Sequence, residues 1–458
     1  MRDNVRTTGP VVLLGVVMTM LDTTIVNVAL GPLAGGFGAS LADTQWVATG
    51  YLLALVMTVP LSGWAVGRFG ARKVWLVSLL LFGAGSALCA AAWSVGSLVA
   101  FRAVQGLGGG LLLPVGQAML ARAAGPERMG RAMALISVPA MLAPVAGPVL
   151  GGVLLDGPGW RWLFLVNLPV CAAALVAAAL LLPRDEPAGA AGLDVAGLAL
   201  LSPGLAALVF GLSEVGDGAS PAHPALWIGA ALLAAFVARG LRTPAASVAR
   251  GPRTPPALVD LRLFGDRAFA AAVAALACYS AAAFGVTVLI PLHSQLAQGG
   301  SALEAGLLLA PLGVGAALTM PLAGRLTDSR GPRGVATAGV ALVVAGIAGY
   351  AAWGGVLPVL VLGLGHGLVS PSLMAAAFRT LDRAALPAAT TLSTIAVRVA
   401  SPVGVALAAV LLQVFTRAGA DRPYAWVFGC VLALAAVPLA PIALIGSKAW
   451  KASWSARA

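Results

Sequence analysis

Residues 106–114 read Gly-Leu-Gly-Gly-Gly-Leu-Leu-Leu-Pro, and residues 363–371, which lie 257 positions later, read Gly-Leu-Gly-His-Gly-Leu-Val-Ser-Pro. Both stretches interrupt long apolar runs, where small residues let helices approach closely. A second pair has a similar spacing, because Gly63-Trp-Ala-Val-Gly-Arg-Phe-Gly-Ala-Arg is echoed by Gly324-Arg-Leu-Thr-Asp-Ser-Arg-Gly-Pro-Arg, 261 positions later. Ala143-Pro-Val likewise matches Ser401-Pro-Val. Repetition on this scale predicts two related halves.

The composition indicates that most of the chain is surrounded by lipid. Hydrophobic residues make up 60% of the 458 residues and charged residues only 10%, with a mean hydropathy of +0.96. This leaves too little polar surface to coat a globule in water. The net charge of +12 comes from short basic clusters between apolar runs, a pattern that belongs to membrane topology rather than to nucleic-acid binding.

The apolar runs predict fourteen transmembrane helices of about 20 residues each. The repeated stretches fall in spans two, four and five and again in spans ten, twelve and thirteen. Each partner therefore lies eight spans later, which predicts an all-α integral membrane protein of two pseudo-symmetric six-helix bundles with two inserted helices. The predicted units are an N-terminal bundle, two inserted helices, a cytoplasmic linker, a C-terminal bundle and a cytoplasmic tail, at residues 1–186, 187–241, 242–267, 268–446 and 447–458.

The distribution of basic residues predicts the orientation in the membrane. With the N-terminus inside, 23 of the 28 lysines and arginines fall in inner segments, three in outer segments and two within spans. Basic residues are retained on the cytoplasmic side, and tryptophans favour the interface. Seven tryptophans fall at predicted outer helix ends. We therefore predict a multi-pass protein of the cell (inner) membrane with both termini in the cytoplasm.

Asp22 lies in the middle of the first apolar run and is the only acid deep in a predicted span. A carboxylate in lipid is costly, and such groups are usually functional. Asp22 is therefore the leading candidate to carry a proton, and the alternative is a helix-to-helix hydrogen bond or ion pair. Arg102, near the outer end of span four, must reach water, a carboxylate or backbone carbonyls. An arginine close to Asp22 would favour the charged form of that acid and offers one route to coupling, and a simple pair between helices is the alternative.

Further polar residues inside predicted spans are candidates to line a cavity. Each one is equally compatible with a hydrogen bond between helices. These residues are Asn27, Gln105, Gln117, His293, Gln295, His366, Arg398 and Gln413. Three histidines and four cysteines without ligand spacing predict no metal site and no cofactor.

In four motifs the chain resembles the major facilitator superfamily, in its fourteen-spanner drug:proton antiporter branch. The motifs are Leu21-Asp-Thr-Thr-Ile-Val-Asn-Val-Ala-Leu, the loop from Gly63 to Lys73, Arg102-Ala-Val-Gln-Gly-Leu-Gly and Gly147-Pro-Val-Leu-Gly-Gly. The resemblance implies proton transfer at Arg102 and export of drugs or antibiotics. It also implies that the antiporter motif, comprising Gly147, Pro148, Gly151 and Gly152, seals the extracellular side, and simple helix packing is the alternative.

The loop motif occurs twice and departs from the family pattern in its first copy. That copy carries Gly63, Arg68, Gly70, Arg72 and Lys73, with Gly67 where the family has an acid. The second copy retains the acid and carries Gly324, Asp328, Arg330 and Arg333. We therefore expect a cytoplasmic gate that depends mainly on the second copy, and the alternative is that both loops only anchor the topology.

Competing functions are an ATP-driven pump, a membrane enzyme and a nutrient importer. The chain has no phosphate-binding Gly-x-x-x-x-Gly-Lys-Ser/Thr loop and no cluster of catalytic side chains, so it is predicted not to be an enzyme. A proton-coupled importer or facilitator of a small metabolite remains the main alternative to an exporter. The expected partners are protons, membrane lipid and a small molecule that is lipophilic and neutral or weakly charged. The protein is expected to be a monomer and to bind no nucleic acid.

Overall fold

The computed structural model describes residues 3–183, 192–216, 220, 222–242, 260–299, 302–382 and 384–445, and its regular structure there is helical throughout. Most of the predicted linker and the whole predicted tail lie outside these described residues. The first half of the chain forms α1 (Asp3–Ile25), η1 (Val26–Ala29), α2 (Leu30–Phe37), α3 (Leu41–Thr58), α4 (Leu61–Phe69), α5 (Ala71–Ala90), α6 (Val95–Ala124), η2 (Pro126–Arg128), α7 (Met129–Asp156), α8 (Trp162–Leu165) and α9 (Asn167–Leu181).

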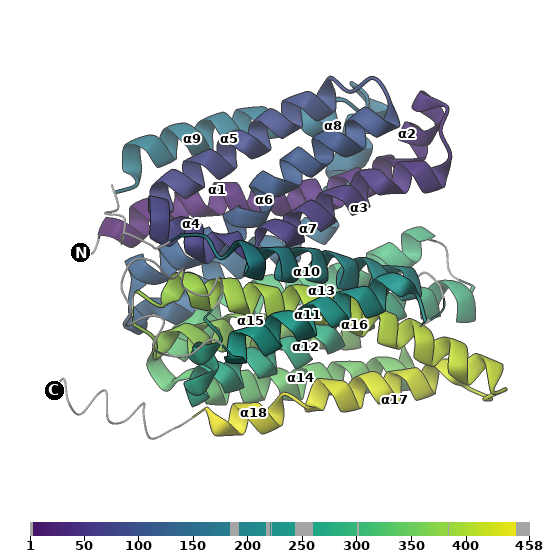
Figure 1. Ribbon diagram of the computed structural model, residues 1–458. Helices are drawn as coiled ribbons and strands as arrows, with labels where there is room; N and C mark the ends of the chain where they lie inside the picture. Colours follow the sequence, from purple (N-terminus) through teal and green to yellow (C-terminus); the bar gives the residue numbers. More distant parts are fainter. Residues whose placement is uncertain are drawn as a thin grey trace.

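The second half forms α10 (Val195–Gly216), α11 (Pro224–Arg242), η4 (Leu261–Gly265), α12 (Arg267–Leu292), η5 (His293–Ala297), α13 (Ala302–Arg330), α14 (Pro332–Trp353), α15 (Val356–Arg379), α16 (Leu386–Arg417), α17 (Pro423–Ala436) and α18 (Leu439–Leu444). Helices α1–α9 form one bundle and α12–α18 a second bundle (Figure 1). Helix α10 packs against α3 of the first bundle and α16 of the second, and α11 packs against α10.

The helices have the length and composition of membrane spans. Within the described residues, eleven are long and apolar enough to cross a bilayer, or twelve when α3 and α4 count as one span with a 55° bend. The bend follows Pro60, which lacks the amide hydrogen needed to continue the helix. The start of α1 and the end of α18 lie at the same end of the molecule, as expected for an even number of crossings (Figure 1).

The repeated loop motif has the same backbone conformation in both halves. Gly70 ends α4 with φ 85° and ψ 150°, and Gly331 ends α13 with φ 90° and ψ 158°. This region of backbone space is essentially open only to glycine. The two glycines are 261 positions apart, so the sequence repeat corresponds to a repeated turn between neighbouring helices.

The glycines quoted from the first half bring α6 into contact with helices on two sides. A Cβ added at Gly106 would lie 2.5 Å from the Tyr51 carbonyl oxygen of α3. One added at Gly108 would lie 2.6 Å from the Phe82 amide nitrogen of α5. Real Cβ atoms do not approach backbone atoms so closely. Helices α3 and α5 can therefore pack against α6 at these positions only because the residues there are glycines.

The matching glycines of α15 do the same in the second half. A Cβ at Gly367 would lie 2.5 Å from the Ala316 carbonyl oxygen of α13, and one at Gly365 would lie 2.6 Å from the Gly339 carbonyl oxygen of α14. Helices α3, α5 and α6 therefore correspond to α13, α14 and α15. The packing explains why the glycines recur with a fixed spacing.

Replacing Gly108 by Ala is expected to lower the thermal stability of the detergent-solubilised protein. The methyl group forces α5 and α6 apart, and overpacking of this kind costs about 1–3 kcal/mol. The same change at Gly306 of α13, where a Cβ would meet no atom within 4 Å, is the matched control. Equal melting temperatures for the two variants would contradict the close-packing explanation.

Candidate functional site

Asp22 and Arg102 form an ion pair in the interior of the first bundle. Asp22 lies in the last turn of α1 and Arg102 in the second turn of α6, and each residue is 1% exposed. The Arg102 Nη1 atom lies 2.6 Å from the Asp22 Oδ2 atom. The structure therefore brings together the two residues that the sequence nominated for proton coupling.

Two amides complete the environment of the carboxylate. Gln105 Nε2 donates to Asp22 Oδ1 at 2.9 Å, and Asn167 Nδ2 of α9 donates to the same oxygen at 2.8 Å. Both amide groups also donate to the Ser86 hydroxyl of α5, at 2.9 and 3.0 Å. Asp22 thus joins α1 to α6 and α9 through three donors, and the two amides connect α5 through Ser86. This arrangement offsets the cost of burying the charge of Asp22.

The guanidinium of Arg102 is enclosed on its other sides. Its Nε atom donates to the Val47 carbonyl oxygen at 3.2 Å, and its Nη1 atom also donates to Gln105 Oε1 at 2.7 Å. The Tyr51 ring lies against it, with 3.9 Å between the ring centroid and Cζ. Removing one partner of such a buried pair leaves an uncompensated charge, at a cost of about 3–5 kcal/mol.

Sequence reasoning did not nominate Asn167 or Ser86. Asn167 interrupts an apolar run, so the cost of a polar side chain in lipid would have been a usable signal. Ser86 carries no such signal, because serines satisfy their own helix backbone and are common in membrane helices. Its role depends on α5 and α9 meeting beside α1, which only the packed structure reveals.

The predicted antiporter motif on α7 packs against the end of α1. A Cβ at Gly147 would collide with the Thr24 hydroxyl, and one at Gly151 would lie 3.1 Å from the Ile25 carbonyl oxygen. Gly152 faces open space, with no atom within 4 Å of an added Cβ. The side chain of Pro148 is outside the described residues. The motif thus fixes α7 against the turn of α1 that follows Asp22.

A cavity of about 540 Å³ lies between the two bundles. Its walls come from both bundles and from α10. The first bundle contributes Met20, Thr23, Leu52, Val56, Leu113, Gln117, Ile136 and Ser137, and α10 contributes Val209, Leu212 and Ser213. The second bundle contributes Leu276, Tyr279, Ser280, Ala283, Phe284, Met320, His366, Ser370, Met374, Ser393, Thr394, Val397, Arg398, Ser401, Pro402 and Val405.

Three of the residues nominated as cavity-lining, Gln117, His366 and Arg398, lie in this wall. His366 is hydrogen-bonded to the Tyr279 hydroxyl. The others lie elsewhere or outside the described side chains. Gln105 belongs to the Asp22 network, and His293 packs among Tyr350, Tyr424 and Phe428. Gln295 and Gln413 are not among the wall residues. The Asn27 side chain is not described.

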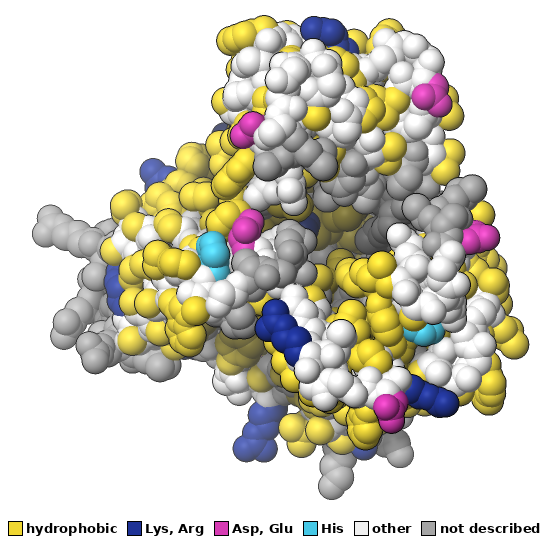
Figure 2. Space-filling model, turned by 90° about the vertical axis from the view of Figure 1, so that its right-hand side faces the viewer, with side chains coloured by type: hydrophobic (Ala, Val, Ile, Leu, Met, Phe, Trp, Pro, Cys, Tyr) yellow, Lys and Arg dark blue, Asp and Glu magenta, His cyan; other side chains and the backbone are white. Residues whose placement is uncertain are grey.

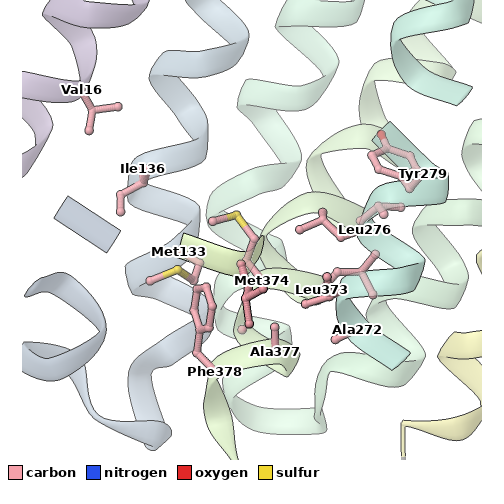
Figure 3. Close-up of a cluster of buried hydrophobic side chains, with 14 of the residues drawn as sticks. Val16, Met133, Ile136, Ala272, Leu276, Tyr279, Leu373, Met374, Ala377 and Phe378 are labelled. Carbon is pink, nitrogen blue, oxygen red and sulfur yellow. The ribbon is translucent and has the colours of Figure 1, made fainter. Parts of the chain in front are cut away.

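The two ends of the molecule differ in how the bundles meet. The end opposite the chain termini is hollowed between its lobes, with apolar side chains on the walls (Figure 2). Towards the terminal end the cavity is closed by apolar side chains, among which Met133 and Ile136 of α7 face Met374 and Phe378 of α15 (Figure 3). Access to the cavity is therefore blocked on the terminal side.

An ionic contact holds the closed end together. Asp328, at the end of α13, accepts from the Gly130 amide and from Arg131 Nε at the start of α7, both at 2.8 Å. The carboxylate also lies at a helix N-terminus, which favours negative charge. Arg330 and Arg333 are exposed and make no ion pair with any described residue. The acid of the second motif copy thus contacts the opposite bundle through Arg131 rather than through its neighbours.

The first copy of the motif makes a different contact at this end. Gly67 supplies no carboxylate, and the Ser62 and Thr391 hydroxyls join α4 to α16 at 2.7 Å. Gly63 also faces α16, where a Cβ would lie 3.2 Å from the Thr391 hydroxyl. Arg72 donates to the Ala179 carbonyl oxygen of its own bundle, and Arg68 and Lys73 are exposed.

Comparison with known proteins identifies relatives of the chain. The sequence profile of the Major Facilitator Superfamily matches residues 12–405. The chain is 42% identical over 427 residues to the multidrug resistance protein B homolog of Mycobacterium tuberculosis (strain H37Rv), and the match covers 89% of this chain and 76% of that protein.

Two solved structures share the fold at low sequence identity. The human organic anion transporter MFSD10 superimposes with a TM-score of 0.64 at 18% identity, covering 96% of this chain and 99% of that one. The proton:xylose symporter XylE gives a TM-score of 0.58 at 15% identity, with 95% of each chain covered.

Replacing Asp328 by Asn is expected to open the terminal end more often. The change removes a contact of at most about 1 kcal/mol, since Arg131 is 58% exposed, so the open population rises up to about fivefold. Pulsed electron spin resonance between labels at positions 128 and 329, in a cysteine-free background, measures the distance. Asp382→Asn at the same end is the control, and an unchanged distance distribution for Asp328→Asn would exclude the latch.

Proposed function

The chain belongs to the Major Facilitator Superfamily of membrane transporters, and on that premise we propose that it exports small lipophilic molecules from the cytoplasm in exchange for protons. The observation that carries the proposal is the buried pair of Asp22 and Arg102 directly behind the cavity wall, where Met20 and Thr23 of α1 line the cavity. The family consists of transporters rather than enzymes.

We propose fourteen membrane spans for the whole chain. Twelve come from the helices counted above, with α3 and α4 as one span. Helix α7 has 28 residues, and α11 has an apolar stretch at Pro224–Gly240, so these two supply the remaining crossings. The matching of α3, α5 and α6 with α13, α14 and α15 supports two six-helix bundles in which α10 and α11 are the insertion.

We further propose that the terminal end faces the cytoplasm of a cell (inner) membrane. Described arginines cluster at this end, including those of both loop motifs. Tryptophans mark the opposite end, where six of them are exposed: Trp46, Trp93, Trp162, Trp227, Trp353 and Trp426. Basic residues on the inside and tryptophans at the interface agree with this orientation. In that orientation the cavity is closed towards the cytoplasm and faces outward.

In the proposed cycle, a proton from outside neutralises Asp22 and breaks its pair with Arg102. The loss of charge weakens the attachment of α1 to α6 and α9, because Arg102 and Gln105 of α6 and Asn167 of α9 all donate to that carboxylate. Helix α1 lies against α7 through Gly147, and α7 carries the Arg131 contact to Asp328. Release of α1 is thereby linked to the cytoplasmic latch, as alternating access requires.

Export is favoured over import by the name of a relative, the multidrug resistance protein B homolog, and by the largely apolar cavity wall. The wall can take up lipophilic molecules without many specific hydrogen bonds. A proton-coupled importer or facilitator of a metabolite is the second candidate, since the pair of Asp22 and Arg102 would serve either direction.

The proposal is tested in inverted membrane vesicles with a preformed acidic interior. Adding members of a panel of lipophilic antibiotics and dyes is expected to dissipate the pH gradient, reported by a fluorescent weak base. Asp22→Asn mimics the protonated state permanently, so the response should fall at least about tenfold, because no other deep carboxylate replaces it. Asp421→Asn, at an exposed acid, is the control.

Two results would overturn the proposal. A response that persists in Asp22→Asn would remove the proton role of this residue. Accumulation of a compound without any proton movement would identify a facilitator instead.

A further inference from the structure

The charge of the cavity wall is one-sided. Arg398 on α16 lines the cavity, and no aspartate or glutamate is among the wall residues. Within the part of the chain that the structure describes, Arg398 has neither an ion pair nor a hydrogen-bond partner, in contrast to Arg102. Arg398 is half-buried, and a guanidinium that faces a largely apolar cavity attracts an anion more strongly than one in bulk water. The cavity therefore provides a site for an anion that the protein itself does not fill.

The hydroxyl of Thr394, one turn earlier on the same helix, provides a second, independent observation. Thr394 is four residues before Arg398, so the two side chains share one face of α16. Thr394 is 5% exposed, and its hydroxyl has no hydrogen-bond partner although it is buried in the cavity wall. A hydroxyl donor beside a guanidinium matches the two oxygens of a carboxylate.

The other bundle offers a complementary acceptor. Gln117 of α6 is also 5% exposed and lines the cavity, and its Oε1 atom has no partner. Buried polar atoms are normally satisfied, so an open acceptor in a ligand-sized cavity indicates a donor on the ligand. The other titratable groups of the wall, His366 and Tyr279, are hydrogen-bonded to each other.

Most of the wall between these polar groups is apolar. Met20, Leu52 and Val56 contribute from the first bundle, and Phe284 and Met374 from the second. A volume of about 540 Å³ falls within the range of about 300–1,000 Å³ that accommodates drug-sized molecules.

We propose that the transported molecule is an amphipathic organic anion, with a carboxylate or comparable acidic group bound by Arg398 and Thr394 and a lipophilic body in the apolar part of the cavity. The proposal rests on the proposed export function and narrows its substrate from lipophilic molecules in general to lipophilic acids. Cations are disfavoured, because the Asp22 carboxylate is behind the wall and already occupied by Arg102.

The test is a binding measurement with the full chain in lipid nanodiscs. The probes are dansyl-leucine, its neutral amide dansyl-leucinamide, and a quaternary ammonium dansyl compound of similar size, with empty nanodiscs subtracted. The anion should bind at least about tenfold more tightly than the amide, as a charge-assisted pair with arginine implies. The quaternary ammonium compound should bind more weakly than either.

Substitutions assign the preference to Arg398. Arg398→Gln should remove the advantage of the anion while the affinity for the amide stays within about twofold, and Arg398→Lys should retain part of it. Arg417→Gln, at an exposed arginine further along α16, should leave all affinities unchanged. Should Arg398→Gln prove unstable, Thr394→Val in the otherwise native cavity must still reduce anion binding.

Equal binding of anion and amide, tighter binding of the cation, or equal losses for all probes in Arg398→Gln would overturn the proposal. Measuring proton movement in vesicles with the native chain, alongside the binding measurement, separates this outcome from failure of the export function. A protein that prefers the anion but moves no protons would refute antiport and leave the anion site standing.

Discussion

The need to keep one carboxylate charged inside a membrane protein organises the first bundle. Asp22 is stable there only because Arg102, Gln105 and Asn167 donate to it, and these donors come from helices that must therefore meet at one point. Ser86 links the two amides, and the Tyr51 ring covers the guanidinium. A change in the charge of this single group alters the balance of forces on every helix around it. The site is for that reason both a structural centre and a candidate switch.

The close approach of helices is the second constraint, and it is met by the same means in both bundles. Lipid offers no hydrophobic force between helices, so packing at glycines supplies much of the association. In α6 and α15 the glycines face two neighbours each, which fixes the arrangement of three helices in each half. The backbone of α6 holds Arg102 and Gln105, and that of α15 holds His366. Packing and placement of polar groups therefore depend on the same short motif.

Much of this arrangement was accessible from the sequence, because its signals are strong in a membrane. Asp22 and Arg102 stand out among apolar residues and were each nominated because of the cost of a charge in lipid, and the structure pairs them. The helical fold and the repeat were predicted from apolar runs and spaced glycines. The partners Asn167 and Ser86, and the contact from Asp328 to Arg131, were not predicted, since each depends on which distant helices meet. Likewise, Arg398 was nominated as a cavity residue, but its lack of a counter-charge and its place beside Thr394 required the packed bundle.

The two loop motifs differ in the kind of contact that holds the closed end, and this difference affects how each contact responds to salt. The contact between α7 and α13 depends on the carboxylate of Asp328 and the largely exposed guanidinium of Arg131, whose attraction is screened as ionic strength rises. The contact between α4 and α16 is a hydrogen bond between the hydroxyls of Ser62 and Thr391, which carry no net charge, so salt does not screen it. The two contacts therefore differ in salt sensitivity. At high salt concentration the contact between α7 and α13 is weakened before the contact between α4 and α16.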